Sequence, residues 1–155
     1  RFIDRKENLI FYGNSEVGKT HLATAIGVTA AQNRNSTYFI KCADLMTALH
    51  KAQAEDRLNE RIKKYSGYKL LIIDELGYLP ISKNDSKLFF QLIDRRYEKS
   101  STIITTNINF SEWDEIFGEP MIANAIIDRL FHHATVVTIK GKSYRLQNYY
   151  GDEGK

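Results

Sequence analysis

The chain has 155 residues, of which 43% are hydrophobic and 26% charged, and its net charge is +3 at pH 7. This composition suits one soluble domain with a sizeable core, and the charge is too small to indicate a nucleic-acid partner by itself. The single cysteine, Cys42, excludes an internal disulfide and fits a reducing compartment. Because no apolar run approaches the ~18 residues of a membrane span and no signal peptide is visible, we expect a cytoplasmic location. The first residue is Arg1 rather than Met, so we expect residues 1–155 to be one domain of a longer protein that continues upstream.

Near the start of the chain, Gly13–Thr20 matches the phosphate-binding P-loop pattern G-x-x-x-x-G-K-[ST]. The apolar run 9–12 before it is strand-like, and 21–26 after it has a helical pattern. Glycines allow backbone N–H groups to point at phosphate oxygens, Lys19 can neutralise the β- and γ-phosphates, and the Thr20 hydroxyl can bind Mg²⁺. We therefore expect a nucleotide site formed by Gly13, Asn14, Ser15, Glu16, Val17, Gly18, Lys19, Thr20 and His21.

Short apolar runs alternate with helical patterns over the rest of the chain, which indicates parallel βα units of an α/β fold. We expect Asp44 to cap a helix that runs to Ala52. Ser111 is expected to open a short helix that ends at Gly118. The other helices are expected over 57–65, 85–98 and 121–130, and the five strands over 9–12, 37–41, 70–73, 102–105 and 135–139.

The third expected strand, 70–73, is apolar throughout and is followed directly by Asp74 and Glu75. Such a strand is typical of the buried centre of a parallel sheet, and ligands bind at the carboxyl ends of these strands. Asp74 is thus placed to hold Mg²⁺ together with Thr20, and Glu75 to act as general base for the attacking water. Two acids after a strand more often belong to a solvated loop, but the P-loop favours the catalytic interpretation.

Two later motifs carry weaker signals. Asn107 follows the fourth strand, where its amide could bind the γ-phosphate or the attacking water, but a turn-forming asparagine explains it equally well. The pair His132-His133 invites a metal interpretation. We reject that interpretation from the sequence because adjacent side chains are expected to point apart and no Cys or further His lies at ligand spacing.

A P-loop, a strand ending in Asp-Glu and a strand ending in Thr-Asn, in this order, resemble the core of an AAA+ ATPase. Longer stretches more closely resemble the IstB-like ATP-binding proteins that serve insertion-sequence transposases, and the helicase loader DnaC shares most of them. One departure is Asn14-Ser15-Glu16 inside the P-loop, where the family usually has small residues, Pro or Gly. We expect the backbone cradle to survive this change, whereas the extra carboxylate of Glu16 near the phosphates would weaken nucleotide affinity. The matching stretches are Gly18–Ala23, Ile72–Pro80, Arg96–Glu98, Thr105–Asn107, Phe110–Trp113, Asp128–His133 and Gly141–Arg145.

This resemblance implies roles for residues that the spacing alone leaves open. Asn107 would be the sensor, and Arg129 the arginine finger that reaches the γ-phosphate of a neighbouring subunit. A planar, permanently charged guanidinium suits the charge that develops in phosphoryl transfer. The structural alternative is that Arg129 pairs with Asp128 or Asp114, and Arg145 is a second candidate for the finger.

By the same resemblance, the stretch 44–65 contains the additional helix that initiator-type AAA+ proteins turn toward DNA. Arg57, Arg61 and Lys64, here called the basic stripe, fall on one helical face, although such a stripe is more often only solvated. Too few residues follow Ile139 for the full C-terminal lid that most AAA+ proteins carry. We expect an AAA+ core with a five-stranded parallel sheet between helices.

The leading hypothesis is that residues 1–155 form the AAA+ ATPase domain of an IstB-like transposition helper. It would bind ATP and Mg²⁺, assemble head-to-tail, and engage DNA, duplex rather than single-stranded, for a transposase. A DnaC-like replicative helicase loader remains open, with a helicase and single-stranded DNA as partners. Alternatives of other classes are a monomeric small-molecule P-loop kinase and a nucleotide-gated binding module with negligible hydrolysis.

Overall fold

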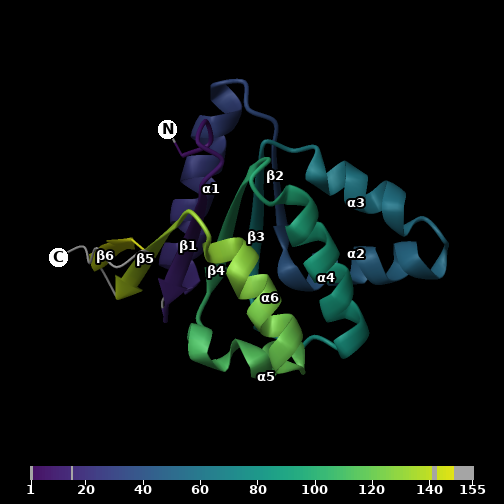
Figure 1. Cartoon of the computed structure of the whole chain (residues 1–155). Coiled ribbons are helices and arrows are strands. Elements are labelled where there is room, and N and C mark those ends of the chain that lie inside the picture. Colours follow the sequence, from purple (N-terminus) through teal and green to yellow (C-terminus); the bar gives the residue numbers. More distant parts are fainter. Residues whose placement is uncertain (1, 15, 141–142, 149–155) are drawn as a thin grey trace.

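The computed structural model is built on one six-stranded sheet with the strand order β2-β3-β4-β1-β5-β6 (Figure 1). It describes residues 2–14, 16–140 and 143–148, with side chains for all of these except 16, 17 and 143–148. The strands are β1 Asn8–Gly13, β2 Thr37–Lys41, β3 Leu70–Leu76, β4 Ser101–Thr106, β5 Ala134–Lys140 and β6 Ser143–Asn148.

Helices cover the two faces of the sheet unequally. One face is covered by α1, which comes close to the sheet because Gly27 carries no side chain: a Cβ there would lie 2.7 Å from Cδ1 of Ile72. The other face carries the larger core, in which the buried Trp113 and Phe131 pack together. Figure 1 shows α4 and α6 in front of the sheet and α2 with α3 toward its β2 end. The helices are α1 Glu16–Gln32, α2 Cys42–Ala54, α3 Leu58–Ser66, α4 Lys83–Arg96, α5 Trp113–Phe117 and α6 Pro120–Phe131, with a 3₁₀ turn at Phe110–Glu112.

The five parallel strands and the α/β class are confirmed. β1 lies between β4 and β5, and Ile10 is in register with Ile104 and Val136. The structure adds an antiparallel edge strand, β6, which we did not predict. Arg145 lies in β6 opposite Thr138, and its side chain is outside the described residues.

Two predicted helix caps are wrong. α2 begins at Cys42, directly after β2, so Asp44 lies in the first turn of the helix and does not cap it. Ser111 is not a cap either, because the Asn109 side chain accepts a hydrogen bond from the Ser111 backbone N–H at 3.0 Å and thereby caps the 3₁₀ turn. The predicted stop at Gly118 is confirmed: its left-handed φ of 76° ends α5.

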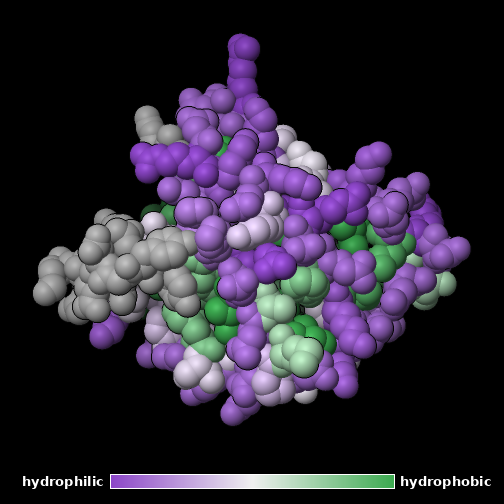
Figure 2. All heavy atoms as spheres, in the orientation of Figure 1, coloured by the Kyte–Doolittle hydropathy of each residue, from purple (hydrophilic) through white to green (hydrophobic). Residues whose placement is uncertain are grey.

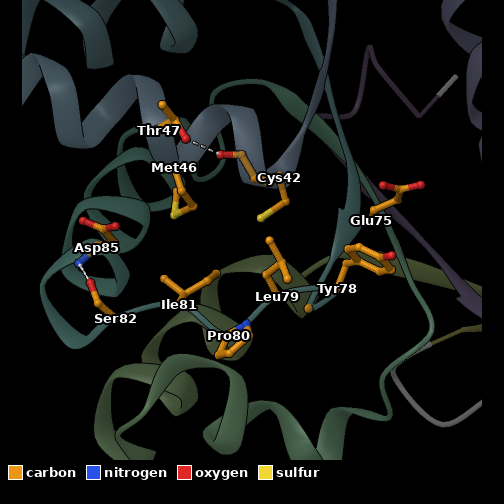
Figure 3. A pocket seen from close by; sticks show the side chains of 12 residues that line it. Cys42, Met46, Thr47, Glu75, Tyr78, Leu79, Pro80, Ile81, Ser82 and Asp85 are labelled. Atoms are coloured by element: carbon orange, nitrogen blue, oxygen red, sulfur yellow. Dashed lines mark hydrogen bonds between the residues drawn. The ribbon is translucent and has the colours of Figure 1, made fainter.

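Hydrophilic residues dominate the upper part of the view in Figure 2, and apolar residues gather in the middle of the view over α6, with a second group on the right near α2 and α3. Met121, at the start of α6, is 79% exposed. Cys42 is buried, and burial raises the pKa of its thiol to about 12. None of the described helices combines the length and the apolar character needed to cross a bilayer.

Candidate nucleotide-binding site

The P-loop joins β1 to α1 and holds Lys19 inside the protein. Gly13, the last residue of β1, lies so close to β5 that a Cβ would collide with the carbonyl oxygen of Ile139. The side chain of Lys19 is 3% exposed, and its Nζ donates to the carbonyl oxygen of Gly13 at 2.6 Å. The loop thus keeps a positive charge where an anion can meet it.

The remaining predicted loop residues lie at its surface or beyond what the structure describes. Asn14 and His21 are both exposed. Ser15 lies outside the described residues, and so do the side chains of Glu16 and Val17. The expected effect of the Glu16 carboxylate on nucleotide affinity stays a prediction.

Asp74 is the buried centre of the site, with an exposed fraction of 1%. The hydroxyl of Thr20 lies 3.0 and 3.1 Å from its two carboxylate oxygens, and the hydroxyl of Thr105 donates to Oδ1 at 2.5 Å. The two predicted metal-binding side chains are therefore in direct contact. Carboxylate and hydroxyl oxygens are hard donors of the kind that Mg²⁺ prefers, so this pair fits the ion.

A β-bulge aims Glu75 differently from a regular strand residue. Ile73 pairs with Ile104 and Leu76 with Thr106, so two residues of β3 face the single Thr105 of β4. Glu75 has a left-handed φ of 62°, which is uncommon for a non-glycine residue and is often found at functional sites. Its backbone N–H donates to the Thr105 hydroxyl at 2.7 Å, which holds this conformation.

A small cavity joins the predicted site residues across three elements. Asn107, exposed directly after β4, is at its edge. The structure therefore brings the P-loop lysine, the acidic pair and the candidate sensor together at the carboxyl ends of the strands. The cavity is lined by Lys19, Thr20, Glu75, Tyr78, Thr105, Thr106 and Asn107.

The part played by Thr105 was not predicted from the sequence. Its hydroxyl accepts from the Glu75 backbone and donates to Asp74, so one side chain positions both acids. In the sequence, Thr105 belongs to an expected strand and to the matching stretch Thr105–Asn107, and neither assigns it a role. The residue type did offer a signal, because a hydroxyl at the carboxyl end of one strand can reach an Asp-Glu pair at the end of the next strand. Using that signal requires knowing that β4 lies beside β3.

Arg129 lies near the amino ends of the strands, whereas this cavity lies at their carboxyl ends. α6 leads into β5, whose first residue Ala134 pairs with Asn8 at the start of β1. Nε of Arg129 is 2.8 Å from Asp94 and Nη1 is 3.0 Å from Asp128, so the predicted pairing with Asp128 exists while Asp94, not Asp114, is the second partner. The hydrogen bond with Asp94 raises the pKa of the Arg129 guanidinium.

The basic stripe lies beside a groove between α2 and α3. Arg61 and Lys64 lie on α3, and Arg57 directly precedes it with Nε 3.2 Å from Oε1 of Glu60. Lys51 of α2 and the stripe residues line a groove of about 210 Å³. Acidic side chains also line this groove, so its positive charge is partly offset.

The expectation that His132 and His133 point apart is wrong. His133 has a left-handed φ of 60°, which turns its side chain toward that of its neighbour. The two ring centroids lie 4.1 Å apart at an interplanar angle of 67°. Extended backbone would have sent adjacent side chains to opposite sides.

The fold and the site together define the class of protein. A P-loop between β1 and α1, an acidic pair at the end of β3, and β4 between these two strands form a P-loop core of the AAA+ type. Within that class the chain belongs to the IstB-like ATP-binding protein family, whose model matches residues 1–150.

Similar sequences support this assignment. The chain is 62% identical over 153 residues to the insertion sequence IS232 ATP-binding protein of Bacillus thuringiensis subsp. berliner, covering 99% of this chain and 61% of that protein. It is 47% identical to the insertion sequence IS21 ATP-binding protein of Pseudomonas aeruginosa, covering 94% of this chain and 55% of that protein. The chain thus spans little more than half the length of these relatives.

Solved structures share the fold. The DnaC helicase loader superimposes with a TM-score of 0.73 at 26% identity, covering 90% of this chain and 84% of that one. DnaI gives a TM-score of 0.77 at 22% identity and covers 90% and 80% of the two chains. The replication initiator DnaA bound to AMPPCP and single-stranded DNA gives 0.74 at 18% identity, covering 90% and 42%.

Proposed function

We propose that residues 1–155 are the ATPase domain of a DNA-transposition helper that hydrolyses ATP and couples this to assembly on DNA. The observation that carries the proposal is the Thr20–Asp74–Thr105 hydrogen-bonded cluster, which lies beside Glu75 at a cavity that Lys19 also lines. Oxygen donors, a positive charge and a carboxylate at one cavity meet the requirements of metal-assisted phosphoryl transfer.

Each side chain has a role that its position supports. Thr20 and Asp74 would hold Mg²⁺, and Lys19 would neutralise the phosphates. Glu75 would accept a proton from the attacking water, while Asn107 would orient that water or the γ-phosphate. Mg²⁺, when bound by these residues, would neutralise negative charge on the phosphates.

The position of Arg129 supports a role at the site of a second subunit. The five residue steps from Ala134 to Ile139 on β5 span roughly 17 Å of extended strand. Arg129 precedes Ala134 in the chain, whereas Gly13 of the P-loop pairs with Ile139 at the other end of β5. An arginine side chain cannot cross the sheet over that length. A head-to-tail contact, which repeats one pair of unlike surfaces, would instead bring Arg129 to a neighbour's γ-phosphate.

The partners are proposed from the family and from the charge distribution. Membership among insertion-sequence proteins favours a transposase and duplex DNA, and the 62% identity to one of them outweighs the 26% identity to the DnaC helicase loader. The basic stripe and Lys51 provide the surface for phosphate contacts, which carry no sequence preference. The family match also favours this role over a small-molecule kinase.

The test of hydrolysis replaces Glu75 by glutamine. Because Glu75→Gln removes the proposed base and leaves Asp74 in place, ATP should still bind while turnover falls by about 10²–10⁴-fold. Binding is measured with a fluorescent ATP analogue and turnover by phosphate release. Glu115→Gln, an exposed residue of α5, is the matched control and should keep both. Equal turnover in Glu75→Gln and the wild type would remove Glu75 from the mechanism.

The test of assembly mixes two inactive variants. Lys19→Ala lacks the P-loop charge and Arg129→Ala lacks the finger, so each should be inactive alone. In an equimolar mixture, roughly a quarter of head-to-tail interfaces would combine an intact P-loop with an intact finger, and activity should return in proportion. If Arg129→Ala alone kept wild-type turnover, Arg129 would have only a structural role, and Arg145 would become the candidate for the arginine finger.

A further inference from the structure

Two turns at the amino ends of the strands bring three metal-binding side chains together, far from the P-loop along the strands. Glu98 lies in the turn between α4 and β4, and His132 and His133 lie in the turn between α6 and β5. One carboxylate oxygen and one nitrogen from each ring all lie within 4.8 Å of one another. From this geometry we propose that Glu98, His132 and His133 form a binding site for a transition-metal ion such as Zn²⁺.

The site is ordered by contacts that already hold its ligands. Nε2 of His132 lies 3.4 Å from Oε2 of Glu98, and the His132 ring packs at 5.5 Å against the ring of Tyr97. Glu98 and His133 both have left-handed backbone, with φ of 59° and 60°, and this conformation turns each side chain toward the cluster. Little rearrangement is needed for three ligands to close on one ion.

The chemistry of the donors selects the class of ion. Two imidazole nitrogens and one carboxylate suit Zn²⁺ and its neighbours Ni²⁺ and Cu²⁺, whereas Mg²⁺ and Ca²⁺ prefer oxygen donors alone. Three protein ligands leave a fourth position of a tetrahedral ion for water or for a group from another molecule. The exposure of all three residues gives the ion a path to enter.

Binding would fasten the two turns to each other beside Arg129. The Tyr97 ring that packs on His132 also lies under the Arg129 guanidinium, 5.2 Å from its centroid. Asp94 and Asp128 pair with Arg129 and offset its charge, so the guanidinium does not repel the ion strongly. The ion would therefore stabilise the end of α6 without contacting Arg129 itself.

The test measures Zn²⁺ binding and thermal stability on the purified protein, without reference to ATP hydrolysis. One Zn²⁺ per chain should compete with a chromophoric chelator, and added Zn²⁺ should raise Tm because it binds the folded state. His133→Asn keeps a residue type that tolerates left-handed backbone and removes one ligand. It should lower Zn²⁺ affinity by more than about tenfold and remove the Tm increase.

Two control variants separate this site from others on the chain. His50→Ala removes an exposed histidine that pairs with Asp85, and Asp74→Asn alters the proposed Mg²⁺ site; both should bind Zn²⁺ as the wild type does. Glu98→Gln is a second ligand variant and should weaken binding like His133→Asn. The proposal is overturned if the wild type shows no Zn²⁺-dependent rise in Tm, or if the two ligand variants bind Zn²⁺ as tightly as the wild type.

Discussion

Two charged side chains are buried at opposite ends of the strands of the same sheet, and they have different kinds of hydrogen-bond partner. Asp74, 1% exposed at the carboxyl ends of the strands, meets the hydroxyls of Thr20 and Thr105. Arg96, 2% exposed at the amino ends, ends α4 and donates mainly to backbone carbonyl oxygens. Its acceptors are the carbonyls of Tyr65, Ser66, Tyr68 and Ser101 at 2.6–3.5 Å and the hydroxyl of Thr102 at 3.0 Å.

The difference shows what each charge can do. Carbonyls at the end of α3 and the start of β4 are fixed by the backbone, so Arg96 ties those segments together. Burial lowers the pKa of the Arg96 guanidinium to about 10, which still leaves it charged near neutral pH. Hydroxyls rotate, and the contacts of Asp74 lie beside a cavity, so its charge can be shared with a cation. A buried charge is structural when its partners are fixed by the backbone. It can serve a function when its partners are side chains that can rotate to admit a ligand.

The largest predicted effect is on folding. Arg96→Ala removes the donor and leaves several buried carbonyls without a partner, so the free energy of unfolding should fall by about 3–5 kcal/mol. Urea denaturation measures it. Arg95→Ala, the exposed neighbour, is the matched control and should change stability by less than about 0.5 kcal/mol. Similar losses in both variants would contradict the structural role of Arg96.

Asp74→Asn should reduce turnover strongly and stability only slightly, the opposite of the effect expected for Arg96→Ala. The amide keeps hydrogen-bonding capacity toward both threonines, so stability should change by less than about 1.5 kcal/mol. Turnover should fall by about 10²–10³-fold, because an amide does not replace a carboxylate opposite Mg²⁺. Stability and phosphate release, measured on the same samples, distinguish the role of Asp74 from that of Arg96. Wild-type turnover in Asp74→Asn would show that Asp74 is also only structural.

The smallest predicted effects come from two threonines of one strand. Thr105→Val removes the hydroxyl that positions Asp74 and Glu75, so turnover should fall about tenfold with a stability loss of about 1 kcal/mol. Thr102→Val removes an acceptor of Arg96 at the other edge and should cost similar stability while turnover stays unchanged. Equal turnover in the two variants would mean that Thr105 does not position the acidic pair.

The sequence by itself determined the local parts of this protein. The P-loop Gly13–Thr20 and the acids Asp74 and Glu75 are consecutive residues whose chemistry follows from their own order, and the strands before them follow from apolar runs. The five parallel strands were predicted on these grounds, and the family was predicted from the longer stretches that resemble IstB-like proteins. Assigning Asn107 to the same edge required only the rule that parallel strands share their carboxyl ends.

Only the tertiary structure decided the features that depend on distant segments or on unusual backbone. The double contact of Thr105 requires β4 to lie beside β3 with a bulge at Glu75, and the burial of Arg96 requires α3 to end above β4. The convergence of His132 and His133 requires a left-handed φ that no periodic pattern encodes. Helical and strand periodicities report which face a residue occupies, whereas contacts between elements depend on strand order and on single dihedral angles that long-range packing selects.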